Sequence, residues 1–200
     1  MTQLKLLRAT QEFFGPRAAG WEERFPNDSP QYARAVADLD PPLGATALDL
    51  GCGTGRALPP LRNFVGPAGR VIGFDATAEM LLEARTLGRD RIAELIFSDA
   101  MHLPLPTAYV DIVFAGGLLP HLADTAAALR EFARVTRPGG KLAVFHPVGR
   151  KTLAARHNQV PSDDDIIAPV RLSQLCVITG WHVGWIDDAE DRYLMLATRC

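Results

Sequence analysis

The chain has 200 residues, of which 48% are hydrophobic and 22% are charged, and its formal net charge is −2. Length and composition are those of one globular domain that can bury a sizeable core. A nearly neutral chain without a run of Lys and Arg argues against a nucleic-acid binder, which usually carries a basic face.

The first forty residues are predicted to form a helical cap. They contain all five aromatic side chains that precede the first strand, namely Phe13, Phe14, Trp21, Phe25 and Tyr32. Apolar residues recur with a helical period over residues 30–39, and Pro41 and Pro42 end that helix.

Strand and helix patterns alternate between residues 45 and 145. Strands are expected at 45–50, 70–74, 93–97, 111–115 and 141–145, and helices at 56–65, 77–87 and 123–135. Such alternation implies right-handed crossovers and a parallel sheet covered by helices on both faces.

The C-terminal part has a different pattern. A helix is expected at 170–179, followed by strands at 181–186 and 193–198. The loop 187–191 is too short for a helical crossover, so these two strands should be antiparallel. Residues 148–168 are polar and irregular and are predicted to be a variable insertion. Together these elements predict a single α/β domain, residues 1–200, with a doubly wound sheet of seven strands.

A glycine-rich turn follows the first strand. Residues 48–56 read LDLGCGTGR. Ligands of open parallel sheets bind beyond the carboxyl ends of the strands, where glycines let the backbone approach them closely. A dinucleotide fingerprint needs glycine at its first, third and sixth positions. Counted from Gly51, the sixth position is Arg56, which disfavours a nicotinamide-dependent oxidoreductase.

Two further acidic residues follow the next two strands. Asp75 can accept hydrogen bonds from ribose hydroxyls, although taken alone it fits a helix cap better. Asp99 can accept from an adenine amine, and its alternative role is that of a turn residue. Together with Asp49 in the glycine turn, they predict a nucleoside site.

These motifs resemble those of class I methyltransferases that depend on S-adenosylmethionine (SAM), in particular the small-molecule enzymes that include those of ubiquinone biosynthesis. The resemblance covers residues 48–55, 71–81, 98–106, 111–124 and 134–141, and less closely the hairpin 181–199. It implies a Rossmann-like sheet, mostly parallel with a C-terminal antiparallel hairpin. It also implies SAM as cofactor, S-adenosylhomocysteine as product and a small molecule as methyl acceptor.

The resemblance further implies a cofactor site built from the turns after four strands. The residues it assigns are Asp49 for the ammonium group; Gly51, Cys52, Gly53 and Gly55 around the methionine part; Asp75 for the ribose; Ala76, Asp99, Ala100 and Met101 for the adenine; and a backbone carbonyl of Ala115, Gly116 or Gly117 for the ammonium.

A general base is needed only where the acceptor must lose a proton. His121, after the fourth strand, is the candidate that family position favours, although a packing role at a helix start is commoner for such a residue. His146 ends the fifth strand and is the weaker candidate. No spacing of histidines or of Cys52, Cys176 and Cys200 suits a metal or a disulfide framework.

The acceptor is expected to lie under the helical cap and the insertion 148–168. Trp21, Phe25 and Tyr32 are candidates for an aromatic lid, with core packing as the commoner role. Four basic residues of the insertion could bind an acidic acceptor or could form a solvated helix face; they are Arg150, Lys151, Arg156 and His157. A non-catalytic SAM-binding or regulatory protein is the alternative function. No apolar run is long enough to span a bilayer, which predicts a cytoplasmic protein; the oligomeric state is not predicted.

Overall fold

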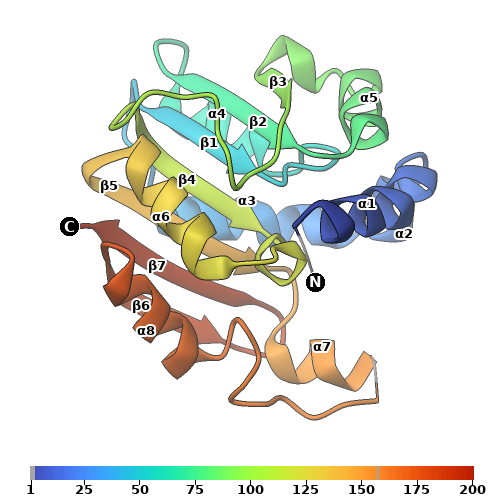
Figure 1. The fold of residues 1–200 in the computed structure, drawn as a ribbon. Coiled ribbons are helices and arrows are strands. Elements are labelled where there is room, and N and C mark those ends of the chain that lie inside the picture. Colours follow the sequence, from blue (N-terminus) through green and yellow to red (C-terminus); the bar gives the residue numbers. More distant parts are fainter. Residues whose placement is uncertain (1–2, 157) are drawn as a thin grey trace.

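The computed structural model describes residues 3–156 and 158–200 (Figure 1). His157, a candidate acceptor residue, lies outside this part. A single mixed sheet runs through the molecule in the order β3-β2-β1-β4-β5-β7-β6. Its strands are β1 (Thr46–Leu50), β2 (Arg70–Asp75), β3 (Glu94–Phe97), β4 (Val110–Gly116), β5 (Thr136–His146), β6 (Trp181–Asp188) and β7 (Tyr193–Arg199).

Strand pairing confirms the predicted topology. The first five strands are parallel, whereas β7 pairs antiparallel with both β5 and β6. Leu50 lies between Phe74 of β2 and Ala115 of β4, so the strand order reverses beside β1. Ligands of doubly wound sheets bind at such a reversal, beyond the carboxyl ends of the strands.

Helices cover both faces of the sheet. They are α1 (Gln3–Phe14), α2 (Trp21–Arg24), α3 (Asp28–Leu39), α4 (Leu58–Val65), α5 (Ala78–Thr86), α6 (Thr125–Val135), α7 (Arg150–Arg156) and α8 (Pro169–Ile178). One apolar layer joins α3 and α4 to the sheet, and a second joins α6 and α8 to its opposite face. None of the helices in the described ranges is long and apolar enough to cross a membrane.

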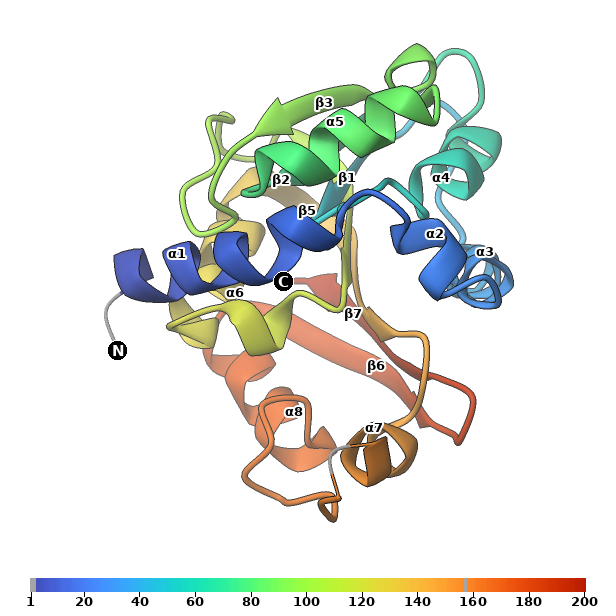
Figure 2. The ribbon, with the colours of Figure 1, turned by 90° about the vertical axis from the view of Figure 1, so that its right-hand side faces the viewer.

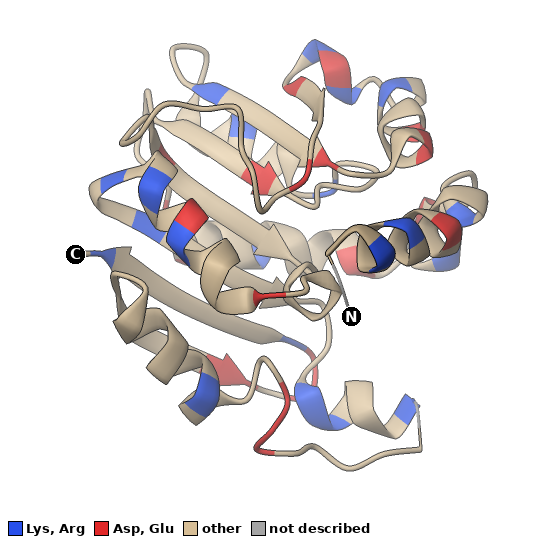
Figure 3. Cartoon of the chain, viewed as in Figure 1, with Lys and Arg blue, Asp and Glu red and all other residues tan. Residues whose placement is uncertain are grey.

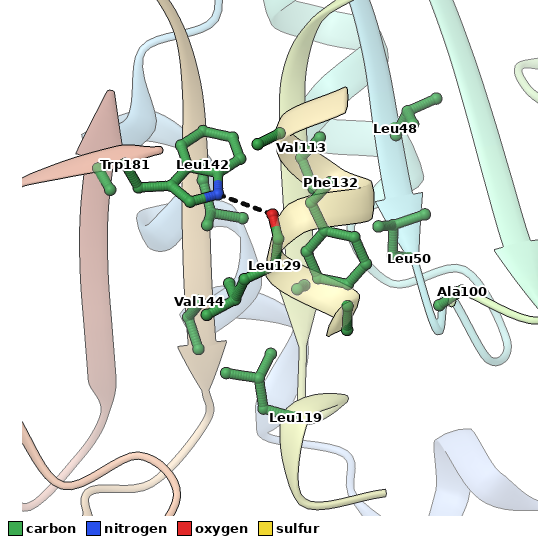
Figure 4. Close-up of a cluster of buried hydrophobic side chains, with 14 of the residues drawn as sticks. Leu48, Leu50, Ala100, Val113, Leu119, Leu129, Phe132, Leu142, Val144 and Trp181 are labelled. Carbon is green, nitrogen blue, oxygen red and sulfur yellow. Dashed lines mark hydrogen bonds between the residues drawn. The ribbon is translucent and has the colours of Figure 1, made fainter. Parts of the chain in front are cut away.

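The layer under α6 shows how the core is closed. Leu129 and Phe132 of α6 pack against Leu48, Val113 and Leu142 from three neighbouring strands (Figure 4). The indole of Trp181 is 1% exposed and donates to the Leu129 carbonyl at 3.0 Å, so its one polar atom is satisfied within the core.

Several boundaries differ from the expected ones for local reasons. Helix α3 begins two residues before Pro30, because the first turn of a helix needs no intrahelical N–H. Helix α6 begins after Asp124, whose side chain accepts from the Ala127 N–H at 2.9 Å. Strand β5 begins at Thr136, five residues earlier than predicted, and continues through the Pro-Gly-Gly turn.

The segment 148–168 was predicted to be irregular, and this is wrong over residues 150–156, which form α7. The Leu-Ala-Ala run of α7 has good helical propensity, but its flanking basic residues conceal any apolar period. Blue and red segments are intermixed over the whole ribbon (Figure 3), so the described chain gathers no single-signed stripe of charge.

Candidate functional site

A cavity of ≈ 540 Å³ lies at the carboxyl edge of the sheet, beside the reversal of strand order. Its volume falls in the range of roughly 300–1,000 Å³ that is usual for small-molecule sites. The turns after β1, β2, β4 and β5 line one side, and α1, α2, α3 and α7 line the other. Within the described residues, no cluster of three or more His, Cys, Asp or Glu could hold a metal ion.

The cavity brings together about half of the residues predicted for the site. Those that line it are Gly51, Cys52, Gly53, Asp75, Ala76, Gly116, Gly117 and His121. Those that do not line it are Asp49, Gly55, Asp99, Ala100, Met101 and Ala115. Asp49 and Ala115 are buried in β1 and β4 behind the lining, and Asp99 to Met101 lie under α1.

The glycines of the turn after β1 have different reasons to be glycine. All three adopt left-handed backbone angles, with φ of 66° at Gly51, 54° at Gly53 and 86° at Gly55. A Cβ atom on Gly51 or Gly55 would meet a leucine side chain at 2.9 or 2.7 Å. A Cβ atom on Gly53 would have only the Met80 sulfur within 4 Å, at 3.9 Å. Gly53 therefore presents an open backbone to the cavity, which suits a closely bound ligand.

Asp75 joins the turns after β1 and β2. Its Oδ2 accepts from the Gly53 N–H at 2.8 Å, and its Oδ1 accepts from the Thr77 N–H at 2.7 Å. Each carboxylate oxygen has a second lone pair, so the side chain can still accept from a diol. The bond to Thr77, the residue that precedes α5, places Asp75 beside the start of that helix, where the sequence offers a helix cap as its alternative role.

Asp49 is the most unusual charged group of the site. It is 2% exposed, and its Oδ2 has no hydrogen-bond partner among the residues that the structure describes. Burial, and to a lesser degree the charge of Asp75, raises the pKa of Asp49 to about 8. A buried carboxylate without a partner is unfavourable unless it is protonated or meets a cation. Asp49 therefore fits the ammonium group that the resemblance assigns to it.

Cys52 lies in the same turn but is not a nucleophile. Its sulfur packs against β2, where a Cβ atom on Gly73 would approach it to 2.9 Å. Burial raises the pKa of the Cys52 thiol well above its usual value, so it stays protonated. Cys52 therefore contributes a backbone segment to the turn and an uncharged side chain to the packing against β2.

Helix α1 lies across the turns that the resemblance assigns to adenine (Figure 2). The Gln3 amide donates from Nε2 to Asp99 Oδ2 at 2.9 Å, and the Met101 N–H donates to Asp99 Oδ1 at 3.0 Å. The Gln11 amide donates to the Ala76 carbonyl at 2.6 Å. An amide N–H₂ thus occupies the acceptor that an adenine amine would use. The sequence alone does not predict the contact of Gln3 with Asp99, because the two residues lie 96 positions apart.

An aromatic wall faces the glycine turn across the cavity. It consists of Phe13, Phe14, Trp21, Phe25 and Tyr32, all from the N-terminal cap. Trp21 packs between two of them, with ring centroids 5.5 Å from Phe14 and 4.9 Å from Phe25. The wall gives the cavity flat apolar surfaces.

Buried ion pairs attach this wall to the glycine turn. The Arg56 side chain is 4% exposed and pairs with Glu22 at 2.9 Å and Asp28 at 3.2 Å. Thr54 also donates to Glu22. In the sequence Arg56 is informative only as a departure from the dinucleotide pattern, because nothing local points to acids some thirty residues away.

Two histidines line the cavity, and burial lowers the pKa of both, so both are mainly neutral near pH 7. The His121 ring packs edge-on against Phe14 with centroids 5.1 Å apart. The His146 Nδ1 lies 3.0 Å from the Val148 carbonyl oxygen. The ring of His146 is therefore held by the backbone, whereas that of His121 is held by packing.

Comparison with known proteins places this site in a family. Residues 48–144 match the family model described as a methyltransferase domain. A demethylmenaquinone methyltransferase of Bacillus licheniformis is 40% identical over 106 residues, which are 52% of this chain and 45% of that protein. One from Lactobacillus johnsonii is 35% identical over 130 residues, 63% of this chain and 49% of that protein. The chain thus spans about half the length of these relatives.

Solved structures show the same fold. A SAM-dependent methyltransferase from Aquifex aeolicus has a TM-score of 0.71 at 22% identity, covering 84% of this chain and 89% of its own. A putative methyltransferase of Haloferax volcanii, solved with a methyltransferase activator, has a TM-score of 0.78 at 22% identity, covering 96% of this chain and 97% of its own. The family match, the fold and the motif positions agree, and they confirm the resemblance seen in the sequence. Residues 48–144 match the methyltransferase-domain family, and they lie within a Rossmann-like sheet that has the fold of solved SAM-dependent methyltransferases.

Proposed function

We propose that the chain binds SAM at the carboxyl edge of its sheet and catalyses methyl transfer to a small, largely apolar acceptor in the adjoining aromatic cavity. The observation that carries this proposal is the unpartnered, buried Oδ2 of Asp49 behind an open glycine turn. A group that brings a positive charge and approaches the Gly53 backbone closely would satisfy both features.

The residues present fit such a group. Asp49 would hold the ammonium, Gly53 would face the methionine part, and Asp75 would accept from the ribose hydroxyls. When bound, SAM supplies a methyl group on a positively charged sulfur, and the transfer leaves S-adenosylhomocysteine. The chain itself contributes position and electrostatics, since this chemistry belongs to the cofactor.

The aromatic wall supports a flat acceptor. Phe14, Trp21 and Phe25 offer ring faces and edges, which favour offset or edge-to-face packing with another ring. The relatives named above are demethylmenaquinone methyltransferases, whose name specifies a quinone-type acceptor for those proteins. An aromatic small molecule is accordingly the acceptor class proposed for this chain.

Titration calorimetry of the full chain with SAM tests the cofactor site, with the related nucleotide NAD as the control ligand. Saturable binding of SAM, but not of NAD, is expected. A folded sample that does not bind SAM would overturn the proposal.

A second experiment separates an enzyme from the alternative, a SAM-binding protein without activity. The chain is incubated with SAM carrying a labelled methyl group and a panel of quinols and phenols. Label in the acceptor, with matching formation of S-adenosylhomocysteine, is expected of an enzyme. Two neutral histidines lining the cavity favour this outcome, because a regulatory binding site needs no proton acceptor beside its ligand.

A further inference from the structure

We propose that His146 is the general base of this reaction, and that the acceptor is an aromatic molecule with an ionisable hydroxyl, of the phenol or hydroquinone class. This inference rests on the proposed methyl transfer, because a base is needed only once an acceptor is to be methylated. It assigns to His146 the role for which the sequence favours His121.

The Val148 backbone holds the Nδ1 side of the His146 ring. The Val148 N–H donates to Nδ1 at 3.3 Å, and the Val148 carbonyl oxygen lies 3.0 Å from the same nitrogen, where donor and acceptor depend on the tautomer. Both contacts use Nδ1, so Nε2 is the ring nitrogen left for a ligand, and the residue lines the cavity. In the tautomer with its proton on Nδ1, the Val148 carbonyl accepts that proton and Nε2 offers a lone pair to the acceptor.

The surroundings of His146 keep it able to accept a proton. Burial is the main cause that lowers the pKa of His146; the Val148 contact opposes this shift, and the positive charge of Arg156 adds to it. Tyr32 also lines the cavity and stays neutral, because burial raises its pKa. Of the two acids in the lining, Asp28 is already paired with Arg56, and Asp75 accepts from the Gly53 and Thr77 N–H groups.

His121 lacks the corresponding support. Its ring packs edge-on against Phe14, and within the described part of the chain no backbone carbonyl fixes its tautomer as Val148 does for His146. Its place between α1 and the β4 turn makes it part of the cavity wall.

The base and the wall together select the acceptor. A phenolic hydroxyl has a pKa near 10, which is within reach of an imidazole, whereas an aliphatic alcohol is a far weaker acid. Arg156 lines the same cavity, and its positive charge would stabilise the oxyanion that forms. The aromatic wall accommodates the ring that carries the hydroxyl.

The proposed step balances in protons and electrons. The O–H bond of the acceptor breaks, its electron pair stays on oxygen, and the proton passes to His146 Nε2. A pair from the oxygen, or from the ring carbon conjugated with it, forms the new bond to the methyl carbon as the carbon–sulfur bond of the donor breaks onto sulfur. For attack at carbon, the displaced ring proton leaves to water and restores the aromatic ring.

The test compares His146→Gln with His121→Gln, and uses the exposed His182→Gln as a matched control outside the site. With a naphthohydroquinone as probe, His146→Gln is expected to lower kcat by about 10²–10⁴-fold and to remove the acidic limb of the pH–rate profile. His121→Gln should retain that limb. Added imidazole should restore part of the activity to His146→Ala.

A readout without turnover uses para-nitrophenol, whose anion absorbs visible light, bound in the presence of S-adenosylhomocysteine. The wild-type protein should shift the bound probe towards its anion, and His146→Gln should not. A wild-type protein that binds the probe as the neutral phenol, or a His146→Gln variant with an unchanged pH profile, would overturn the assignment. Failure of the proposed function itself is distinguishable, because it appears as absent SAM binding in the wild type.

Discussion

Replacement of Asp49 by Asn tests whether the buried carboxylate binds a cationic ligand. The substitution keeps the shape of the side chain and removes its ability to ionise. In the free protein the pKa of Asp49 is about 8, chiefly because of burial. At pH 7 only about a tenth of the molecules therefore carry the anion that an ammonium group requires. Binding of SAM should pull this carboxylate into its ionised form and release one proton.

The expected pH dependence of SAM affinity follows from the pKa of Asp49. Below pH 8 the apparent affinity of the wild-type protein for SAM should rise about tenfold for each pH unit, and above pH 8 it should level off. Between pH 6 and pH 8 the anionic fraction rises about 50-fold, which amounts to about 2.3 kcal/mol. Asp49→Asn should remove this pH dependence. At pH 8.5 it should also weaken binding by about 1.5–3 kcal/mol, the range for a charge-assisted hydrogen bond.

Calorimetry measures both quantities. Titrations in buffers of different ionisation enthalpy give the number of protons released, which should be close to one for the wild type at pH 7 and close to zero for Asp49→Asn. The exposed Asp163→Asn serves as a matched control and should behave as the wild type. Equal proton release by the wild type and Asp49→Asn would refute the reasoning, as would a wild-type affinity that is independent of pH.

The raised pKa of Asp49 also predicts how the unfolding free energy of the free protein depends on pH. Its pKa is raised on folding, from 3.8 to about 8, so the unfolded chain releases this proton at lower pH than the folded chain. The unfolding free energy should therefore fall as the pH rises from about 4 to 8, and Asp49→Asn should lose this part of the slope. Chemical denaturation at pH 6 and 8 measures it. A variant less stable than the wild type at pH 8 would contradict the assignment of burial as the cause.

Three further variants test other parts of the site. Gln3→Ala removes the amide from Asp99 and should strengthen SAM binding by about 1 kcal/mol in calorimetry; weaker binding would show that α1 supports the site instead of competing for it. Gly53 has a φ of +54° in open space, so Gly53→Ala should lower the unfolding free energy, measured in urea, by about 1–2 kcal/mol. Gly55→Ala should lower it more, because its Cβ atom would also meet the Leu58 side chain at 2.7 Å. Equal losses in the two variants would contradict the contact with Leu58. Arg56→Met leaves two carboxylates without their partner and should cost about 3 kcal/mol with faster amide exchange in α2; unchanged exchange there would separate the cap from this ion pair.

Periodicity predicted the strands well where both faces are buried. Residues 45–50 and 111–115 are mostly apolar runs between turn residues, and β1 and β4 lie there within one residue at each end. The early start of β5 was missed because Pro138 and two glycines normally end a strand. Here the first residue of β5 pairs separately, Thr136 with Val110, across an irregular register.

Local motifs predicted one half of the site, and contacts between distant segments build the other. The glycine turn and Asp75 were predictable because their geometry depends on adjacent residues. The missing partner of Asp49, the amide of Gln3 on Asp99 and the carbonyl of Val148 behind His146 depend on how segments meet after folding. No spacing rule reports whether a buried acceptor atom is left unpaired.

This division has a consequence for how such a domain can change its acceptor. The carboxylates and glycines belong to the strand ends, which the core holds rigid, whereas the aromatic wall belongs to the N-terminal cap. The pairs of Arg56 with Glu22 and Asp28 are a buried polar link between the two. Substitutions in the wall should therefore change acceptor choice with little effect on SAM affinity, whereas loss of Arg56 should disturb both. A Trp21→Leu variant that loses affinity for SAM as strongly as Arg56→Met would show that the two halves are not separable.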